Sequence, residues 1–136
     1  MIKELKNQFM QTAFLTTIWV SLLITLFMPM TSVTLVFIWQ IIGIALIAAT
    51  IFGVLYPYFW QYGTLTAPIN ILIMTIANFL GGFSSIYLIS NEMFELIKPY
   101  WWGVLSLTLI LHSILFYFYR NHQNKKIAES LNSLTK

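Results

Sequence analysis

The alternation of apolar and polar positions divides the chain into four long apolar segments. They cover about residues 9–28, 33–56, 68–90 and 99–119, and prolines or short polar clusters separate them. Each has about 20 residues or more, enough to cross a hydrocarbon core of roughly 30 Å at about 1.5 Å per residue. The runs are continuous rather than alternating, which favours helices over the strands of a barrel. The pattern therefore predicts an all-α integral membrane protein, with four transmembrane helices in a compact bundle and short loops.

The prolines agree with this division. Pro29 and Pro57 follow the first two segments, Pro68 begins the third, and Pro99 precedes the fourth. Proline disturbs a helix least at its first turn or just beyond its end. We therefore expect the second helix to stop at Tyr56, directly before Pro57.

The composition indicates which solvent surrounds these segments. Charged residues make up 8% of the chain and apolar residues 59%, whereas soluble domains carry about 25% charged residues. No charged residue occurs between Asn7 and Asn91, and a soluble chain of 136 residues has too little interior for such a span. Residues 1–136 are thus expected to form one membrane domain whose solvent is the lipid bilayer.

The distribution of lysine and arginine predicts the orientation. The side that holds both termini carries six of these residues, and Lys98 is the only one on the opposite side; the six are Lys3, Lys6, Arg120, Lys125, Lys126 and Lys136. Basic residues accumulate on the cytoplasmic side of membrane proteins. A multi-pass protein of a bacterial cell membrane with both termini in the cytoplasm is therefore expected.

An aromatic stretch with no charge follows the second segment. It contains the aromatic residues Tyr56, Tyr58, Phe59, Trp60 and Tyr62. Tyrosine and tryptophan favour the lipid headgroup layer, so the simpler interpretation is an aromatic belt at the cytoplasmic interface. The alternative is that Trp60 and Tyr62 also belong to a surface that binds a protein partner.

Small residues recur at helical spacing in two of the segments. Ala45, Ala49 and Gly53 are four residues apart, as are Ala77 and Gly81. Such faces let helices approach closely in membranes. We favour packing within the four-helix bundle, with a homo-oligomer contact as the alternative.

Three polar side chains stand out within the apolar segments: Gln40, Asn78 and His112. Polar groups at this depth need partners, and hydrogen bonds between helices are the simpler interpretation. A path for a substrate or proton through His112 is the alternative, but proton relays usually use carboxylates and the segments contain none.

The residues give no indication of an enzyme. There is no carboxylate pair, metal-ligand spacing or glycine-rich phosphate loop, and there is no cysteine for thiol chemistry. His112 and Ser113 are adjacent on a helix and point in different directions. We expect neither a catalytic site nor a metal or other cofactor.

The most informative polar stretch is the tail over residues 120–136, "RNHQNKKIAESLNSLTK". Ile127, Leu131 and Leu134 have the spacing of one helix face, which predicts a short amphipathic helix. It either lies on the membrane surface or forms a cytoplasmic docking surface for a protein.

Two stretches resemble a known family: "IWQIIGIALIAATIFGVLYPYFWQYGTLTAPINILI" and "FYFYRNHQNKKIAESLNSL". They are similar to small four-span membrane proteins of Gram-positive bacteria, of unknown function, that are often encoded beside LytTR-type DNA-binding regulators. Asn70 and Ile71 stand where members often have His-Phe, and the first outer loop is only "PMTS". The resemblance implies a membrane inhibitor that restrains a cytoplasmic transcription regulator.

The expected function is regulatory: the protein binds and restrains a cytoplasmic partner. It is not expected to bind nucleic acid directly. Trp60, Tyr62, Ile127, Leu131 and Leu134 are the expected partner-binding residues. A small oligomeric transporter or pore-forming subunit is the alternative, and Gln40, Asn78 and His112 are the residues that its polar path would need.

Overall fold

The computed structural model of the chain describes residues 1–27 and 34–134, the last two without their side chains. Helices hold 94% of the described residues and none lies in a strand, which confirms the all-α class. Four helices are long and apolar enough to cross a membrane. The chain thus has the makeup of a multi-pass membrane protein. The expected turn at 29–32 lies outside the described residues.

The first long helix begins at Ile2, well before the start expected near residue 9, and the second begins close to its expected position. α1 covers Ile2–Phe27 and α2 covers Leu35–Ala48. The hydroxyl oxygen of Thr34 accepts a hydrogen bond from the backbone N–H of Phe37 at 3.2 Å. This contact satisfies one of the N–H groups that a helix start leaves free, and it places the beginning of α2.

The second helix does not stop at Tyr56, so the expectation of an end before Pro57 was wrong. It continues as two π-helical segments, η1 (Ala49–Leu55) and η2 (Tyr58–Tyr62), and the Pro57 backbone between them is helical at φ −59° and ψ −40°. Proline has no N–H to donate, and local π-helical turns are one way in which membrane helices accommodate it. Much of the aromatic stretch is therefore helix rather than loop.

The connection after the third long helix also differs from the expected short loop. α3 covers Ala67–Ile89, and between the expected spans 68–90 and 99–119 lies the short helix α4 (Asn91–Ile97), followed by the 3₁₀ turn η3 (Lys98–Tyr100). Ser90 accepts from the Met93 N–H at 3.3 Å and begins α4. An N-cap serine followed by helix-forming residues explains why this connection is helical.

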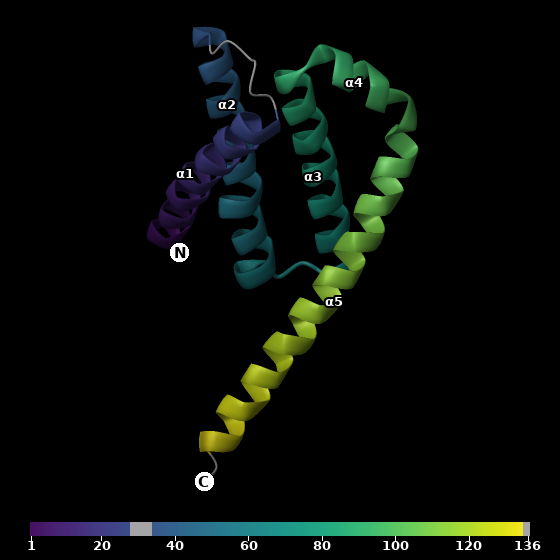
Figure 1. The fold of residues 1–136 in the computed structure, drawn as a ribbon. Helices are drawn as coiled ribbons and strands as arrows, with labels where there is room; N and C mark the ends of the chain where they lie inside the picture. Colours follow the sequence, from purple (N-terminus) through teal and green to yellow (C-terminus); the bar gives the residue numbers. More distant parts are fainter. Residues whose placement is uncertain (28–33, 135–136) are drawn as a thin grey trace.

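The last helix is longer than a membrane span. α5 runs from Trp101 to Leu134 without interruption, so the expected span at 99–119 and the tail form a single helix. In Figure 1 its C-terminal half extends well past the ends of the other helices. At about 1.5 Å per residue, 34 residues measure about 50 Å, against a hydrocarbon core of roughly 30 Å.

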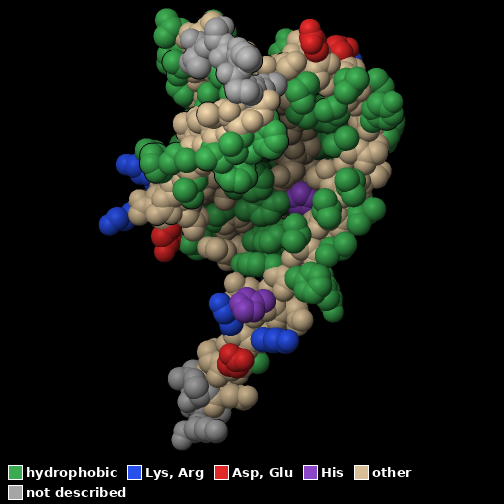
Figure 2. Space-filling model, viewed as in Figure 1, with side chains coloured by type: hydrophobic (Ala, Val, Ile, Leu, Met, Phe, Trp, Pro, Cys, Tyr) green, Lys and Arg blue, Asp and Glu red, His purple; other side chains and the backbone are tan. Residues whose placement is uncertain are grey.

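The long helices pack mainly as neighbours in a row. α1 lies across α2 and η1, and α3 lies between α2 and α5 (Figure 1). This arrangement is more open than the compact bundle that the sequence predicts. Few of the described apolar side chains are buried, among them Ile44, Met74 and Phe116, and Figure 2 shows many apolar side chains on the outside of the face that it draws. Such a surface is stable in lipid and unfavourable in water.

Candidate functional site

The expected small residues lie where helices of this chain contact one another. Ala45 and Ala49 are 3% and 0% exposed, and Gly53 lies directly against α1. A Cβ at Gly53 would stand 2.7 Å from the Cα of Phe9. On α3, Ala77 is half-buried and a Cβ at Gly81 would collide with the side chain of Ile51. The small residues thus lie at contacts within one chain.

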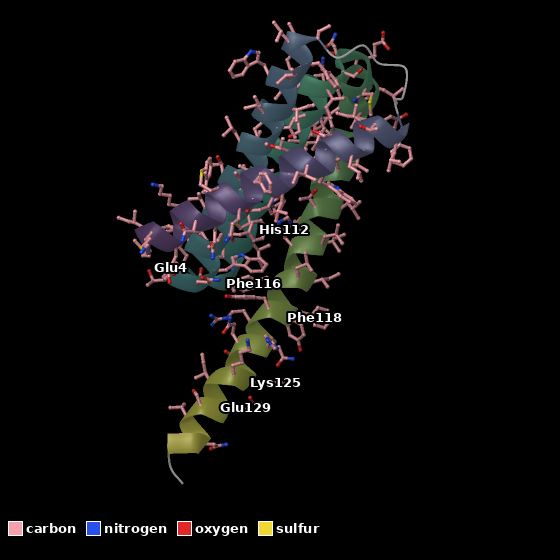
Figure 3. The ribbon with its side chains drawn as sticks, turned by 60° about the vertical axis from the view of Figure 1, so that its left-hand side comes forward. Glu4, His112, Phe116, Phe118, Lys125 and Glu129 are labelled. Carbon is pink, nitrogen blue, oxygen red and sulfur yellow. The ribbon has the colours of Figure 1, made fainter. Side chains whose placement is uncertain are left out.

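A hydrogen-bond network formed by one buried and two half-buried side chains joins three helical segments. Tyr56, which follows η1, contacts His112 of α5 through its hydroxyl group. Asn78 of α3 lies beside both, because its Nδ2 is 3.1 Å from the Tyr56 hydroxyl and 3.1 Å from His112 Nε2. We call Tyr56, Asn78 and His112 the polar triad. His112 is 6% exposed, and Figure 3 shows it on α5 facing the other helices.

The backbone partners of the triad determine the direction of each hydrogen bond. His112 Nδ1 lies 2.7 Å from the carbonyl oxygen of Thr108, and a carbonyl only accepts, so Nδ1 carries the proton. In the neutral ring Nε2 is then an acceptor, and the Tyr56 hydroxyl donates to it. Asn78 Nδ2 donates to the Met74 carbonyl oxygen at 2.9 Å and also to the Tyr56 oxygen. Every donor of the triad therefore has an acceptor.

The triad forms part of the wall of a cavity of about 530 Å³ between η1, α3 and α5. The rest of the wall is mainly apolar and includes Phe79, Phe83 and Leu111, and no charged residue lines it. Figure 2 shows a hollow in this face of the molecule with a histidine side chain at its base. The volume falls within the range of about 300–1,000 Å³ that is common for small-molecule sites.

The other polar residues of the spans lie elsewhere. Gln40 is half-buried on α2 and has no part in the triad. Asn70 is 4% exposed and donates from Nδ2 to the Phe59 carbonyl oxygen at 3.2 Å, which fastens the start of α3 to η2. Of the three polar residues singled out in the sequence, Asn78 and His112 therefore meet and Gln40 lies apart from them.

Tyr56 is the residue of the triad that the sequence assigned to the aromatic stretch alone. A buried tyrosine hydroxyl needs a partner, and Asn78 and His112 are polar residues at comparable depth. This need for a partner is the sequence feature that could have linked Tyr56 to the other two residues. The sequence did not predict that the helix continues through Pro57, which places Tyr56 beside them.

The aromatic residues of η2 have different neighbours: Trp60 packs against α5, whereas Tyr62 contacts α1. The Trp60 ring lies 5.5 Å from the Phe116 ring and 4.8 Å from the Tyr119 ring, measured between centroids. Tyr62 is 40% exposed, and its hydroxyl donates to Glu4 Oε2 at 2.6 Å. Trp60 is therefore largely engaged within the chain, and Tyr62 ties η2 to the start of α1.

The expected apolar stripe of the tail lies on the projecting part of α5. Ile127 and Leu131 are 55% and 58% exposed. Leu134 is the last residue of α5, and its side chain lies outside the described part. Ile127 also borders a shallow cavity of about 210 Å³ whose wall includes Trp60 and Arg120. We call the exposed face formed by Ile127 and Leu131 the tail stripe.

The described residues include no group of three His, Cys, Asp or Glu side chains placed to hold a metal ion. The geometry thus defines a membrane-type helical protein with a polar triad inside and an exposed helical tail. A comparison with protein-family models, curated proteins and solved structures finds no match to this chain.

Proposed function

We propose that this protein is a membrane-embedded regulator that binds a cytoplasmic partner through the tail stripe and restrains it at the membrane. The observation that carries the proposal is the unbroken helix α5, which continues from an apolar span into a basic segment with exposed Ile127 and Leu131. The partner that fits the resemblance is a LytTR-type transcription regulator.

The continuity of α5 favours a protein partner over a position on the lipid surface. A helix that lies in the membrane interface has its axis in the plane of the bilayer, so it needs a bend where it leaves the span. Sharp bends occur at proline, at glycine pairs or at π-bulges, and residues 104–134 contain neither proline nor glycine. A straight continuation directs the tail stripe into water, where apolar side chains gain most from a partner.

The charge distribution supports a cytoplasmic position for this helix. Lys3, Lys6 and Arg120 lie at the same end as the tail, together with the lysines of the tail itself. The excess of basic residues favours a bacterial cell membrane with both termini in the cytoplasm. In that orientation the tail stripe meets cytoplasmic proteins.

The contacts of η2 suggest separate roles for the expected partner-binding residues. Ile127, Leu131 and Leu134 are proposed to touch the partner, as in other helix-mediated complexes. Trp60 packs against Tyr119, and the Tyr62 hydroxyl bonds to Glu4. These two residues are therefore proposed to support the base of this surface. Replacing Trp60 is expected to loosen α5, with a weaker effect on partner binding.

Co-purification tests the proposal. A LytTR-type regulator encoded beside this chain is expected to co-purify with the wild type and with Asn132→Asp, and to be lost with Leu131→Asp. Asn132→Asp is the matched control, because it adds the same charge one position away, at least 100° around the helix from Ile127, Leu131 and Leu134 at about 100° per residue. Equal recovery with both variants would contradict the proposal.

The alternative is a small oligomeric transporter or accessory subunit. The cavity beside the polar triad is the observation that favours it. An exporter subunit encoded beside the chain, together with solute flux that His112→Ala abolishes in a stably inserted protein, would support this alternative over the regulatory one.

A further inference from the structure

We propose that the cavity between η1, α3 and α5 binds a neutral single-chain alcohol whose hydroxyl group donates a hydrogen bond to Asn78. The inference does not depend on the proposed function, because it concerns the interior of the chain rather than the tail.

The hydrogen-bond capacity of the cavity wall determines which polar group a ligand needs. The Tyr56 hydroxyl donates to His112, His112 Nδ1–H donates to Thr108, and Asn78 Nδ2 donates to Met74 and Tyr56. The Thr108 hydroxyl, also on the wall, donates to the Val104 carbonyl oxygen at 2.7 Å. These polar side chains of the wall therefore have no donor left for a ligand.

Acceptors on the same wall remain available. The Met74 carbonyl fixes the orientation of the Asn78 amide, because Nδ2 must face it. Within the described part of the chain, the hydrogen bonds of the Asn78 amide all use Nδ2, which leaves its Oδ1 as an acceptor for a ligand. The Thr108 hydroxyl oxygen also keeps its lone pairs. A ligand group that donates is therefore complementary to this wall, and one that only accepts is not.

The apolar part of the cavity wall determines which kind of ligand body fits. The wall is mostly aromatic and aliphatic, carries no charge, and borders a partly open cavity of about 530 Å³. A charged ligand would lose its hydration without gaining a counter-charge. The volume accommodates one alkyl chain, so the ligand that suits this wall is a single apolar chain with one hydroxyl group.

The experiment uses the whole protein in vesicles of dioleoylphosphatidylcholine, a lipid whose headgroup has no hydrogen-bond donor. The probe is hexadecanol with a photoreactive diazirine in mid-chain, and its methyl ether is the matched compound without the donor. Mass spectrometry of the labelled peptides is expected to find label on segments 79–83 and 111–115. The alcohol should label about five-fold more than the ether, the ratio expected for one hydrogen bond in a membrane.

Two glycines supply a matched pair of variants. A Cβ at Gly82 or at Gly103 meets no atom within 4 Å, but only Gly82 lines the cavity. Gly82→Leu therefore fills the cavity without a backbone collision, and labelling should fall about five-fold or more, whereas Gly103→Leu should label like the wild type. Labelling in Gly82→Leu equal to that in Gly103→Leu would overturn the proposal.

The ratio of alcohol to ether labelling tests the role of Asn78 separately from folding. In Asn78→Leu the ratio should fall from about five toward one, because the acceptor assigned to the ligand is lost while the apolar wall remains. Equal labelling by alcohol and ether in the wild type would mean that acyl chains or water fill the cavity without selection, and would also overturn the proposal. Where Asn78→Leu fails to insert, the wild-type ratio and the two glycine variants decide the result.

Discussion

At the scale of single residues, His112 and Gly53 lie at contacts between helices. His112 accepts from Tyr56 and lies beside Asn78, so one ring links η1, α3 and α5. Gly53 lets α1 approach η1 at backbone distance. Both positions connect elements that are far apart in the sequence.

Replacing the ring tests the structural role of the triad. His112→Ala should lower the free energy of unfolding by about 1–2 kcal/mol, because the Tyr56 hydroxyl loses its acceptor in a buried place. The variant should still insert into the membrane. Thermal unfolding in detergent measures the change, and unchanged stability would mean that the network does not hold the helices.

Adding one methyl group tests the contact between α1 and η1. Gly53→Ala should destabilise by about 1–3 kcal/mol, since the new Cβ would stand 2.7 Å from backbone that cannot easily move. Gly103→Ala is the control, because its Cβ meets nothing within 4 Å. Equal melting of the two variants would show that α1 is not held against Gly53.

At the scale of elements, the hydrophobic pattern predicts the number and approximate positions of the four long helices, because long apolar runs are the strongest signal in a membrane sequence. The pattern does not predict the structure correctly where side-chain contacts determine the backbone conformation. The helix passes through Pro57 as η1 and η2, and residues 91–97 form α4. The polar residues at depth could be identified, but their meeting depends on helix rotation, which one sequence does not specify.

The projection of α5 into water is a prediction about this element. Because the chain has no cysteine, Glu129→Cys gives a unique site for a nitroxide spin label. A straight α5 places the label about 13 Å beyond Arg120, at about 1.5 Å per residue. Power-saturation spectroscopy should find more contact with a water-soluble nickel complex than with oxygen. Greater contact with oxygen would place the tail on the lipid surface.

At the scale of the whole molecule, four membrane crossings would put both termini on one side of the membrane. The basic residues at that end predict that this side is the cytoplasm. A fluorescent protein fused after Lys136 should therefore fluoresce, and alkaline phosphatase fused there should be inactive. Active phosphatase at this position would reverse the orientation and remove the tail stripe from cytoplasmic partners.

The most direct measurement of the central claim is the affinity of the purified regulator for this protein in nanodiscs. A LytTR-type regulator encoded beside the chain should bind saturably to the wild type and to Asn132→Asp. Leu131→Asp should weaken binding about ten-fold or more, because a charge would replace an apolar contact at the interface. Equal affinity of Leu131→Asp and the wild type, or no saturable binding to the wild type, would contradict the account.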